Sequence, residues 1–429
     1  MFDKIKNNTF IKSTLILLFG GILGKMVGFI IRIIVTRMLS TRAIGLYSLL
    51  GPTSSLLTTI AIFSYSNAIS KFISDKSSKS DELITSIIPF SIIFNIIFIV
   101  LTTLFATILS TYLLHEYDLY LPIICISFTM PFISISAILK GYFWAKQNMS
   151  PYMLSNFIEQ VLRLVLIIAF LNKFSNDIHK LCFIILINII GEISSWIVML
   201  FYIPKNKYKY LKFKININEI IKVLKYCIPA TSSKIIGSLS YFLEPILLTN
   251  ILLYVGYSKD YITFEYGVIN AYSLSILLMA QFFTQNMSVS LIPELSMNYK
   301  NNRSLCKRRI KQIILLSMFI GLSSTIIITL FPEFFLKLLF NTTKGVDYIR
   351  LLAPFIVLLY IESPLINAIS AIGDTKELFK ITLKVSMIRI ISIIVFSFFK
   401  IGMYSLVITI IINIITSTYM YYKKLNELL

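Results

Sequence analysis

Residues 84–112 read ITSIIPFSIIFNIIFIVLTTLFATILSTY, an apolar run without one charged side chain. A helix needs about 20 mainly apolar residues to cross a bilayer, so this run predicts one membrane-spanning helix. Similar runs recur along the chain, and the predicted spans are residues 12–38, 44–73, 84–112, 119–143, 152–173, 180–203, 222–252, 264–291, 309–331, 346–372, 377–399 and 402–422. The sequence therefore predicts an all-α polytopic membrane protein with about 12 transmembrane helices.

The composition agrees with a chain whose solvent is lipid. Hydrophobic residues make up 57% of the sequence, whereas soluble domains contain about 45–50%. The net charge is +20, but charged residues are only 14% of the chain. Lys and Arg are concentrated in short loops, as in membrane proteins, and not in a basic domain with its own core. We therefore expect no nucleic-acid partner. The four cysteines show no metal-binding or disulfide spacing, so neither site is expected.

Loop charge predicts the orientation of the chain. One set of alternate loops carries most of the Lys and Arg residues, with the densest runs in segments 204–225 and 300–311. The positive-inside rule places these loops, and with them both termini, in the cytoplasm. The expected location is the bacterial cytoplasmic membrane. The external loops are too short for a catalytic domain, which disfavours an integral-membrane enzyme such as a glycan polymerase or ligase.

An internal repeat divides the chain into two halves. Lys25-x-x-Gly28 is matched by Lys234-x-x-Gly237, and segment 145–163 aligns without a gap with segment 371–389, which superposes Arg163 on Arg389. Related halves are common in transporters. We therefore expect two parallel six-helix lobes: an N-terminal lobe at residues 1–203, a basic cytoplasmic linker at 204–221 and a C-terminal lobe at 222–429.

Basic residues within the predicted spans are the main candidates for a functional site. A basic side chain at a helix centre costs about 2.5–3.5 kcal/mol, so these cannot all face lipid. They line a wet cavity, pair with acids or extend to the interface. Pairing with Glu159 is an open alternative for Arg163, and extension to the interface is one for Lys384. The predicted substrate-binding cations are Lys25, Arg32, Lys234, Arg163 and Arg389.

Acidic residues also occur within the spans. They are candidates for pairing with the cations or for binding a coupling ion, either Na⁺ or H⁺: Glu159, Glu192, Glu244 and Glu362. No other cofactor, no catalytic residue and no structural metal is expected. A cationic cavity suits an anionic substrate, because Lys and Arg bind phosphate well. A lipid-linked sugar fits this chemistry, since its pyrophosphate has to cross hydrocarbon while its tail stays in lipid.

Several motifs resemble the polysaccharide-transporter branch of the MOP exporter superfamily, the branch that includes stage V sporulation proteins and lipid II flippases. They are Gly28-Phe-Ile-Ile-Arg32, Ile44-Gly-Leu-Tyr47, Lys140-Gly-Tyr-Phe143 with Gln147-Asn-Met-Ser-Pro151, Leu291-Ile-Pro-Glu294 and Leu351-Leu-Ala-Pro354. The resemblance covers nearly the whole chain. It implies two six-helix bundles around a V-shaped central cavity, with alternating access and cavity arginines on the first helix, where Arg32 is the best match.

The implied function is a flippase for a polyprenyl-pyrophosphate oligosaccharide or peptidoglycan precursor, and a monomer is expected. Lipid II and sporulation members carry two more C-terminal helices, and this sequence ends after the twelfth predicted span; the glycan therefore stays open. The alternative is a MATE-type multidrug or cation antiporter of the same superfamily. Such relatives use intramembrane acids, whereas the charge in the first span is basic.

Overall fold

The computed structural model describes residues 9–74, 80–146, 148–203, 215–289, 291, 295, 299, 302–372 and 375–429. All regular elements of this described part are helical. Nine helical segments are long and apolar enough to cross a bilayer, and a bent helix pair is a tenth. Together with α2 and α17, which are 30 and 23 residues long, they overlap all twelve predicted spans. The prediction of an all-α polytopic membrane protein is confirmed.

Contacts between Cα atoms divide the chain into two compact units. Unit 1 comprises Met1–Met38 with Leu50–Ser238, and unit 2 comprises Leu39–Leu49 with Leu239–Leu429. Two helices contribute to both: α3 (Thr41–Ile62) passes from unit 2 into unit 1, and α9 (Ile217–Val255) passes from unit 1 into unit 2. The predicted lobe boundaries at 203 and 222 stay a prediction.

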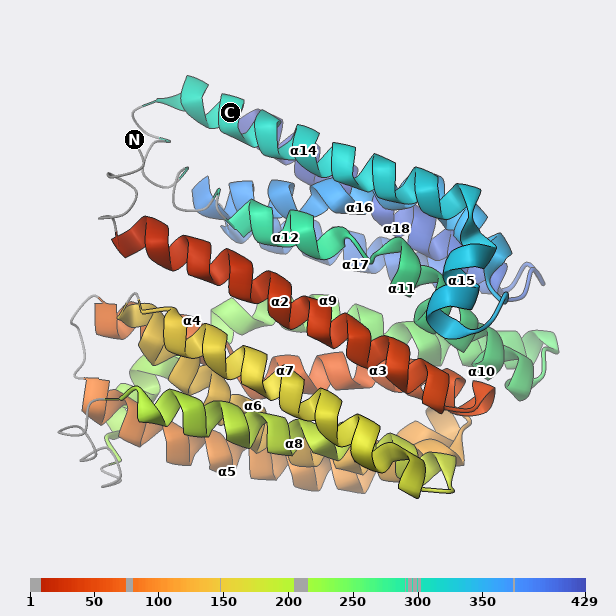
Figure 1. The fold of residues 1–429 in the computed structure, drawn as a ribbon, viewed down its shortest axis with the longest axis horizontal. Helices are drawn as coiled ribbons and strands as arrows, with labels where there is room; N and C mark the ends of the chain where they lie inside the picture. The colour runs from red at the N-terminus through yellow and green to blue at the C-terminus, as the bar shows by residue number, and fades with distance from the viewer. Residues whose placement is uncertain are drawn as a thin grey trace. The chain divides into compact units, whose positions relative to one another are not determined.

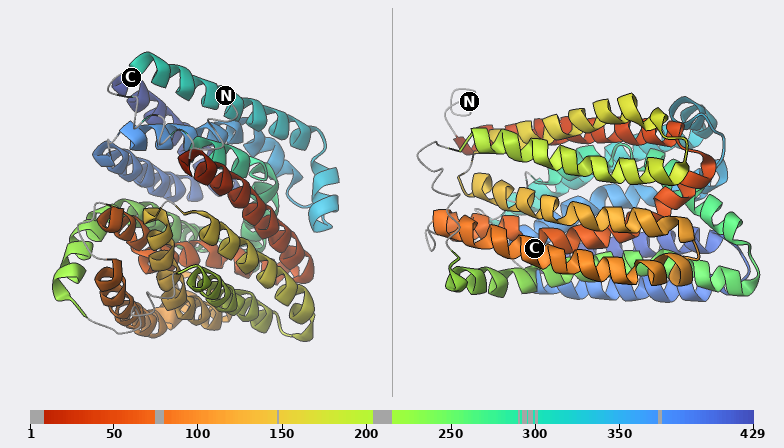
Figure 2. Two further views of the ribbon diagram at one scale, coloured as in Figure 1. Left: turned by 60° about the vertical axis from the view of Figure 1, so that its left-hand side comes forward. Right: turned by 90° about the horizontal axis from the view of Figure 1, so that it is seen from below.

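Unit 1 is arranged around α6 (Tyr120–Ala145), which packs against α4, α5 and α8; α7 packs against α2 and α8 (Figures 1 and 2). Its other elements, apart from parts of α3 and α9, are α2 (Thr9–Met38), α4 (Tyr65–Ser74), α5 (Ser80–Thr107), the π-helical turn η1 (Ile108–Leu113), η2 (Tyr117–Leu119), α7 (Ser150–Phe170), η3 (Leu171–Lys173) and α8 (Asp177–Phe201). A buried apolar cluster that includes Tyr65, Leu83 and Tyr142 joins α4, α5 and α6.

Unit 2 is arranged around α16 (Val346–Ile372), which packs against α12, α14, α17 and α18. Its other elements are α10 (Lys259–Gly267), the π-helical turn η5 (Val268–Ser273), α11 (Leu274–Leu277), α12 (Gln281–Val289), α14 (Arg303–Leu330), α15 (Pro332–Phe340), α17 (Thr375–Ser397) and α18 (Tyr404–Leu428). A buried cluster that includes Cys306, Leu365 and Tyr421 joins α14, α16 and α18.

Exposed apolar side chains identify the surfaces that face lipid. In α5, Ile93 and Phe105 are each 58% exposed, and in α14 Phe319 is 71% exposed. A water-soluble protein rarely exposes such continuous apolar surface. These faces are therefore solvated by acyl chains, in agreement with a multi-pass membrane protein.

Two predicted spans are interrupted in ways that hydropathy does not reveal. The predicted span 44–73 is broken between α3 and α4, where Phe63 and Ser64 adopt positive φ values of 42° and 55°. The predicted span 264–291 is bent by 60° between α11 and α12. At this bend the Tyr360 hydroxyl donates to the Leu277 carbonyl over 2.8 Å. The broken backbone is satisfied by a side chain from α16, which a one-dimensional pattern cannot show.

Two loop regions also gain structure beyond the sequence pattern. The segment 331–350, apolar but too short to span, contains the separate helix α15. Helix α9 begins at Ile217, inside the predicted linker, because the Asn216 side chain accepts a hydrogen bond from the Asn218 amide over 3.1 Å and caps the first turn. Linker residues 204–214 lie outside the described residues.

Candidate functional site

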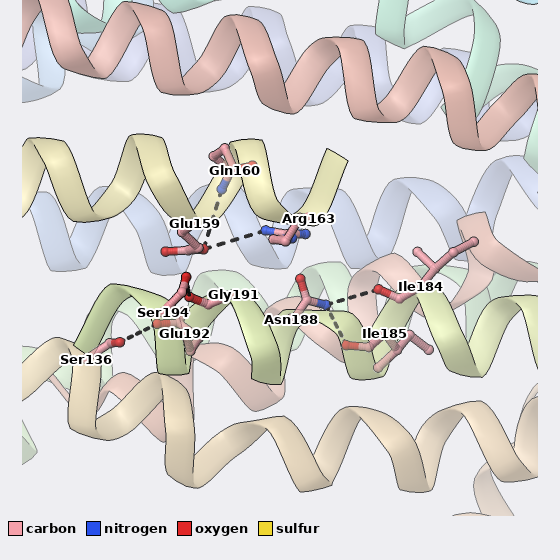
Figure 3. Close-up of polar contacts among 10 residues, drawn as sticks. All are labelled: Ser136, Glu159, Gln160, Arg163, Ile184, Ile185, Asn188, Gly191, Glu192 and Ser194. Atoms are coloured by element: carbon pink, nitrogen blue, oxygen red, sulfur yellow. Dashed lines mark hydrogen bonds and ion pairs between the residues drawn. The ribbon is translucent and has the colours of Figure 1, made fainter. Parts of the chain in front are cut away.

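Three helices of unit 1 bring charged side chains together inside the bundle. Glu159 and Arg163 lie one turn apart on α7 and point toward α8, which carries Glu192 (Figure 3). Glu159 Oε1 lies 3.7 Å from Arg163 Nη1, so the ion pair anticipated from their spacing is present. Glu159 is only 6% exposed and Glu192 only 9% exposed. Two carboxylates in the membrane are costly unless they are paired or protonated.

A glycine on α8 permits this close approach. A Cβ atom at Gly191 would lie 2.9 Å from Arg163 Cδ and 3.1 Å from Glu159 Cγ, closer than ordinary side-chain contacts. Any larger residue would therefore displace the two charged side chains of α7. The position of the glycine directly before Glu192 keeps the charges of α7 and α8 within the same small volume.

Glu192 is held by a short hydrogen-bond chain. The Ser136 hydroxyl on α6 donates to Glu192 Oε2, and the Trp196 indole N–H donates to Ser136 Oγ over 2.8 Å. The indole can only donate, which leaves the hydroxyl hydrogen of Ser136 free for the carboxylate. Glu192 Oε2 thus receives a hydrogen bond from α6, and the donating hydroxyl is itself held by a side chain of α8.

Lys140 adds a second cation to the cluster. It is half-buried on α6, its Nζ lies 5.7 Å from the centre of the Tyr152 ring, and it acts electrostatically on both Glu159 and Glu192. Lys140 belongs to one of the family motifs but was not predicted as a site residue, because it lies near the end of a predicted span. Ser136 and Trp196 were also missed, since apolar spans contain many such side chains.

Part of the cluster lacks hydrogen-bond partners. Among the described residues, Glu159 Oε2 and Arg163 Nε are buried and have none. Gln160 Nε2 is 3.5 Å from Glu159 Oε1, so the polar contacts of this carboxyl are concentrated on one oxygen. The other oxygen is available for a proton or another small ligand.

Unit 2 contains a different arginine–glutamate pair. Arg389 on α17 donates from Nε to Glu244 Oε2 on α9 over 2.6 Å, and its guanidinium lies 5.1 Å from the centre of the Tyr241 ring. Glu244 is 2% exposed. Arg389 is thus held by an acid from another helix, whereas Arg163 is paired within its own helix.

The first helix packs against α7 through its glycines. A Cβ atom at Gly24 would lie 3.1 Å from Asn156 Nδ2, and one at Gly28 would lie 3.6 Å from Gln160 Oε1. Small residues thus let α2 lie close to the polar face of α7. Gln160 connects this seam with the Glu159 cluster.

The two cations of α2 are exposed on a face of their own. At about 100° per residue, Lys25 and Arg32 share one side, roughly a quarter turn from the glycine seam, and both are exposed. Exposed apolar side chains lie on a different side of the same helix: Leu23, Met26 and Ile30. Helix α2 therefore has an apolar exposed face suited to lipid and a basic exposed face suited to water or an anion.

Lys234 on α9 is a third exposed cation of unit 1. It lies between two inter-helix contacts on one stripe: Thr231 donates to Ser64 Oγ over 3.0 Å, and Ser238 Oγ lies 2.8 Å from Thr59 Oγ1. The residues before and after Lys234 on this side of α9 contact other helices, yet Lys234 itself is exposed.

The remaining predicted residues lie elsewhere in unit 2. Glu362 on α16 interacts with Ser417 on α18, and Lys384 is exposed on α17. Within the described part of the chain, no group of three or more His, Cys, Asp or Glu side chains is placed to hold a metal ion. Lys25, Arg32 and Lys234 are thus exposed, whereas Arg163 and Arg389 are each paired with a glutamate.

Comparisons with known proteins give a matching family, several relatives and a shared fold. Residues 10–299 match the model of the family described as "Polysaccharide biosynthesis protein". The chain is 28% identical to stage V sporulation protein B of Bacillus subtilis (strain 168), over 85% of this chain and 73% of that protein. It is 23% identical to the capsular polysaccharide biosynthesis protein CapF of Staphylococcus aureus, over 95% and 97%. A solved inward-facing multidrug resistance MATE family transporter of the MOP superfamily superposes with a TM-score of 0.75 at 14% identity, over 97% of this chain and 98% of that one.

Proposed function

This chain belongs to the polysaccharide biosynthesis protein family, in the polysaccharide-transporter branch of the MOP exporter superfamily, and from that membership we propose that it is a flippase. Its substrate in this proposal is a polyprenyl-pyrophosphate oligosaccharide or peptidoglycan precursor, carried across the cytoplasmic membrane. The family and the structural neighbours are transporters, so the chain is a transporter and not an enzyme.

The exposed cations of unit 1 are the observation that carries the proposal. Lys25, Arg32 and Lys234 remain exposed on helices that cross the membrane. Each would cost about 2.5–3.5 kcal/mol if it faced hydrocarbon. A pyrophosphate offers two negatively charged groups to such cations, and Lys and Arg bind phosphate oxygens through charge-assisted hydrogen bonds. In this mechanism the cations hold the headgroup while the polyprenyl tail remains in lipid.

The names of the relatives support a glycan. One relative is named for capsular polysaccharide biosynthesis and another for sporulation. Capsule and cell-wall glycans both require a polar sugar to cross the membrane. We propose alternating access as the transport mode and cytoplasmic termini as the orientation, in line with the loop charges. The bound coupling ion in this proposal is Na⁺ or H⁺, and the transporter acts as a monomer.

A MATE-type multidrug or cation antiporter is the second candidate. The similarity of fold to a multidrug MATE transporter favours it. The exposed charges of unit 1 argue against it, because three cations repel a cationic drug. The two candidates therefore predict opposite substrate charge.

Reconstituted transport separates the candidates. Purified protein in liposomes is given a fluorescent polyprenyl-pyrophosphate glycan, and the fraction that reaches the opposite leaflet is measured by quenching. We expect flipping by the wild type and its loss in Arg32→Ala and Lys25→Ala. Lys337→Ala is the matched control, because Lys337 is an exposed lysine on α15 that pairs with Glu333 of the same helix over 3.9 Å; it should flip like the wild type.

The same liposomes identify the alternative. Uptake of an organic cation without movement of any lipid-linked glycan would assign the chain to drug export. Full flipping activity in both Arg32→Ala and Lys25→Ala would exclude these residues from the binding site.

A further inference from the structure

We propose that the Glu159 carboxyl is a proton-binding site of this transporter and that Glu192 serves as its fixed negative neighbour. The assignment of the proton to transport rests on the proposed function, whereas proton binding itself does not. The inference stands on the geometry of the cluster formed by α6, α7 and α8 (Figure 3).

One oxygen of the Glu159 carboxyl has a place for a proton. Glu159 Oε2 is buried and has no hydrogen-bond partner among the described residues, and the side chain is more than nine-tenths buried. The contacts with Arg163 and Gln160 are to the other oxygen and are long, at 3.7 Å and 3.5 Å. A buried ionised oxygen without a donor loses its hydration without replacement. A proton on Oε2 removes this cost directly.

The hydrogen-bond chain on Glu192 is the second argument. Glu159 and Glu192 are both buried carboxyls of this cluster, and they differ in their hydrogen bonds. Ser136 donates to Glu192, and Trp196 donates to Ser136. Glu192 Oε2 thus has a donor, whereas Glu159 Oε2 has none among the described residues. We therefore assign the proton to Glu159.

The side chains around Glu159 offer no ligand set for a metal cation. Arg163 lies on the same helix and Lys140 on α6, and both act electrostatically on Glu159. Tyr152 is the further titratable group beside Lys140, and α2, which packs against α7, carries Lys25 and Arg32. Neither cation has an acceptor atom that could coordinate Na⁺, and within the described residues no group of three or more His, Cys, Asp or Glu side chains is placed to hold a metal ion. A proton forms a covalent O–H bond and needs only the one bare oxygen.

The proton step has a defined charge balance. The carboxylate of Glu159 takes one proton from water and becomes a neutral acid; release returns that proton to water. In the ionised state, Glu159 and Glu192 balance Arg163 and Lys140. In the protonated state, the cluster carries one net positive charge and Arg163 loses its counter-charge. Because Gln160 joins Glu159 to the glycine seam of α2, this change acts on the helix that presents Lys25 and Arg32.

Infrared difference spectroscopy tests proton binding without any substrate. Full-length protein in lipid is titrated from neutral to acidic pH, and the carbonyl band of protonated carboxylic acids is followed. We expect a band from a buried acid to grow as the pH falls, to be absent in Glu159→Gln and to persist in Glu192→Gln. Ser136→Ala is a milder variant that removes the donor of Glu192 and should add a second band. Persistence of the first band in Glu159→Gln would overturn the proposal.

A transport arm then separates this proposal from the proposed flippase function. In liposomes, an imposed proton gradient should accelerate flipping by the wild type, and Glu159→Gln should lose that acceleration. If no lipid-linked glycan moves but the Glu159 band titrates, the flippase proposal fails and the proton site stands. If added Na⁺ at constant pH shifts the infrared band of the ionised Glu159 carboxylate, Glu159 binds Na⁺ and the assignment of a proton site is wrong.

Discussion

Arg163 in unit 1 and Arg389 in unit 2 occupy corresponding positions of the internal repeat but are held in different ways. Arg163 has a loose partner on its own helix, Glu159, at 3.7 Å, and its Nε has no hydrogen-bond partner in the described part of the chain. Arg389 donates from Nε to Glu244 of another helix over 2.6 Å. Arg163 is therefore adjustable, whereas Arg389 is locked.

The alignment of the halves shows how this difference arises. The register that superposes Arg163 on Arg389 places Val385 at the position of Glu159, and the register that superposes Lys25 on Lys234 places Val35 at the position of Glu244. The acid has thus changed helix between the two halves. Val35 is fully buried against neighbouring helices, while Val385 packs on the apolar cluster of α14, α16 and α18. Each half therefore has an arginine paired with a glutamate. Glu244 reaches Arg389 from a different helix, whereas Glu159 lies on the same helix as Arg163.

The position of the acid determines what each pair can do. A pair across two helices fixes those helices together, since neither charge can leave without exposing the other in a poorly solvated place. A pair within one helix places no constraint on neighbouring helices. We infer that unit 2 uses its pair for rigidity and that unit 1 keeps its pair available for a change of charge state.

Removal of the unit 2 acid should have the largest effect on stability. Glu244→Gln leaves the Arg389 guanidinium without its carboxylate, and breaking a buried pair in this way costs about 3–5 kcal/mol. The four cysteines are buried and none of them forms a disulfide, so a thiol-reactive dye reports thermal unfolding in detergent. We expect a large decrease in the midpoint of the unfolding curve.

The comparator is Glu159→Gln in unit 1. Its ion pair is longer and lies within one helix, so its removal should cost less, about 1–3 kcal/mol. Equal losses of stability in the two variants would contradict the distinction between a locked and an adjustable pair.

Moving the acid within unit 2 sharpens the comparison. Glu244→Val combined with Val385→Glu recreates on α17 the spacing of Glu159 and Arg163. The double variant should recover about 2 kcal/mol of the loss caused by Glu244→Val, because a partner one turn away again neutralises the buried guanidinium. Thermal unfolding of the single and double variants measures the recovery. Val385→Glu alone is the control and should not stabilise the protein; a double variant no more stable than Glu244→Val would rule out the transfer.

The sequence predicted the membrane fold, both arginines and the pairing of Arg163 with Glu159. Long apolar runs have few alternatives to membrane helices, and the gapless match of segments 145–163 and 371–389 is enough to identify both arginines. The spacing of Glu159 and Arg163 also suggested their pairing, because residues one turn apart share a helix face.

The partner of Arg389 was not predictable from spacing. Glu244 and Arg389 are far apart in the sequence and on different helices, and several acids competed for several cations. The Ser136–Glu192–Trp196 chain was hidden for a related reason: each member is ordinary in an apolar span, and only helix packing brings them together. The bend beside Leu277 contains no proline or glycine that would predict it. The Tyr360 hydroxyl of α16 donates a hydrogen bond to the Leu277 carbonyl at this bend.

Crowding the unit 1 cluster tests whether its charges need the glycine of α8. Gly191→Ala places a methyl group 2.9 Å from Arg163 Cδ and 3.1 Å from Glu159 Cγ. Overpacking costs about 1–3 kcal/mol, and the better helix propensity of alanine returns up to about 1 kcal/mol. We expect a net loss of about 1–2 kcal/mol in thermal unfolding. Gly28→Ala is the control, because its new methyl would meet only Gln160 Oε1 at 3.6 Å; a larger loss there than at Gly191 would contradict the crowding argument.

The smallest expected effect comes from the outer end of the Glu192 chain. Trp196→Phe removes the N–H that donates to Ser136 but keeps an aromatic ring against Phe132, whose ring centre lies 5.4 Å from that of Trp196. The lost hydrogen bond should cost about 1 kcal/mol. Trp144→Phe is a matched control, since the chain has two tryptophans and the Trp144 N–H has no hydrogen-bond partner within the described residues. Thermal unfolding should show a larger loss for Trp196→Phe than for Trp144→Phe. The reverse order would mean that the hydrogen bond from Trp196 to Ser136 does not stabilise unit 1.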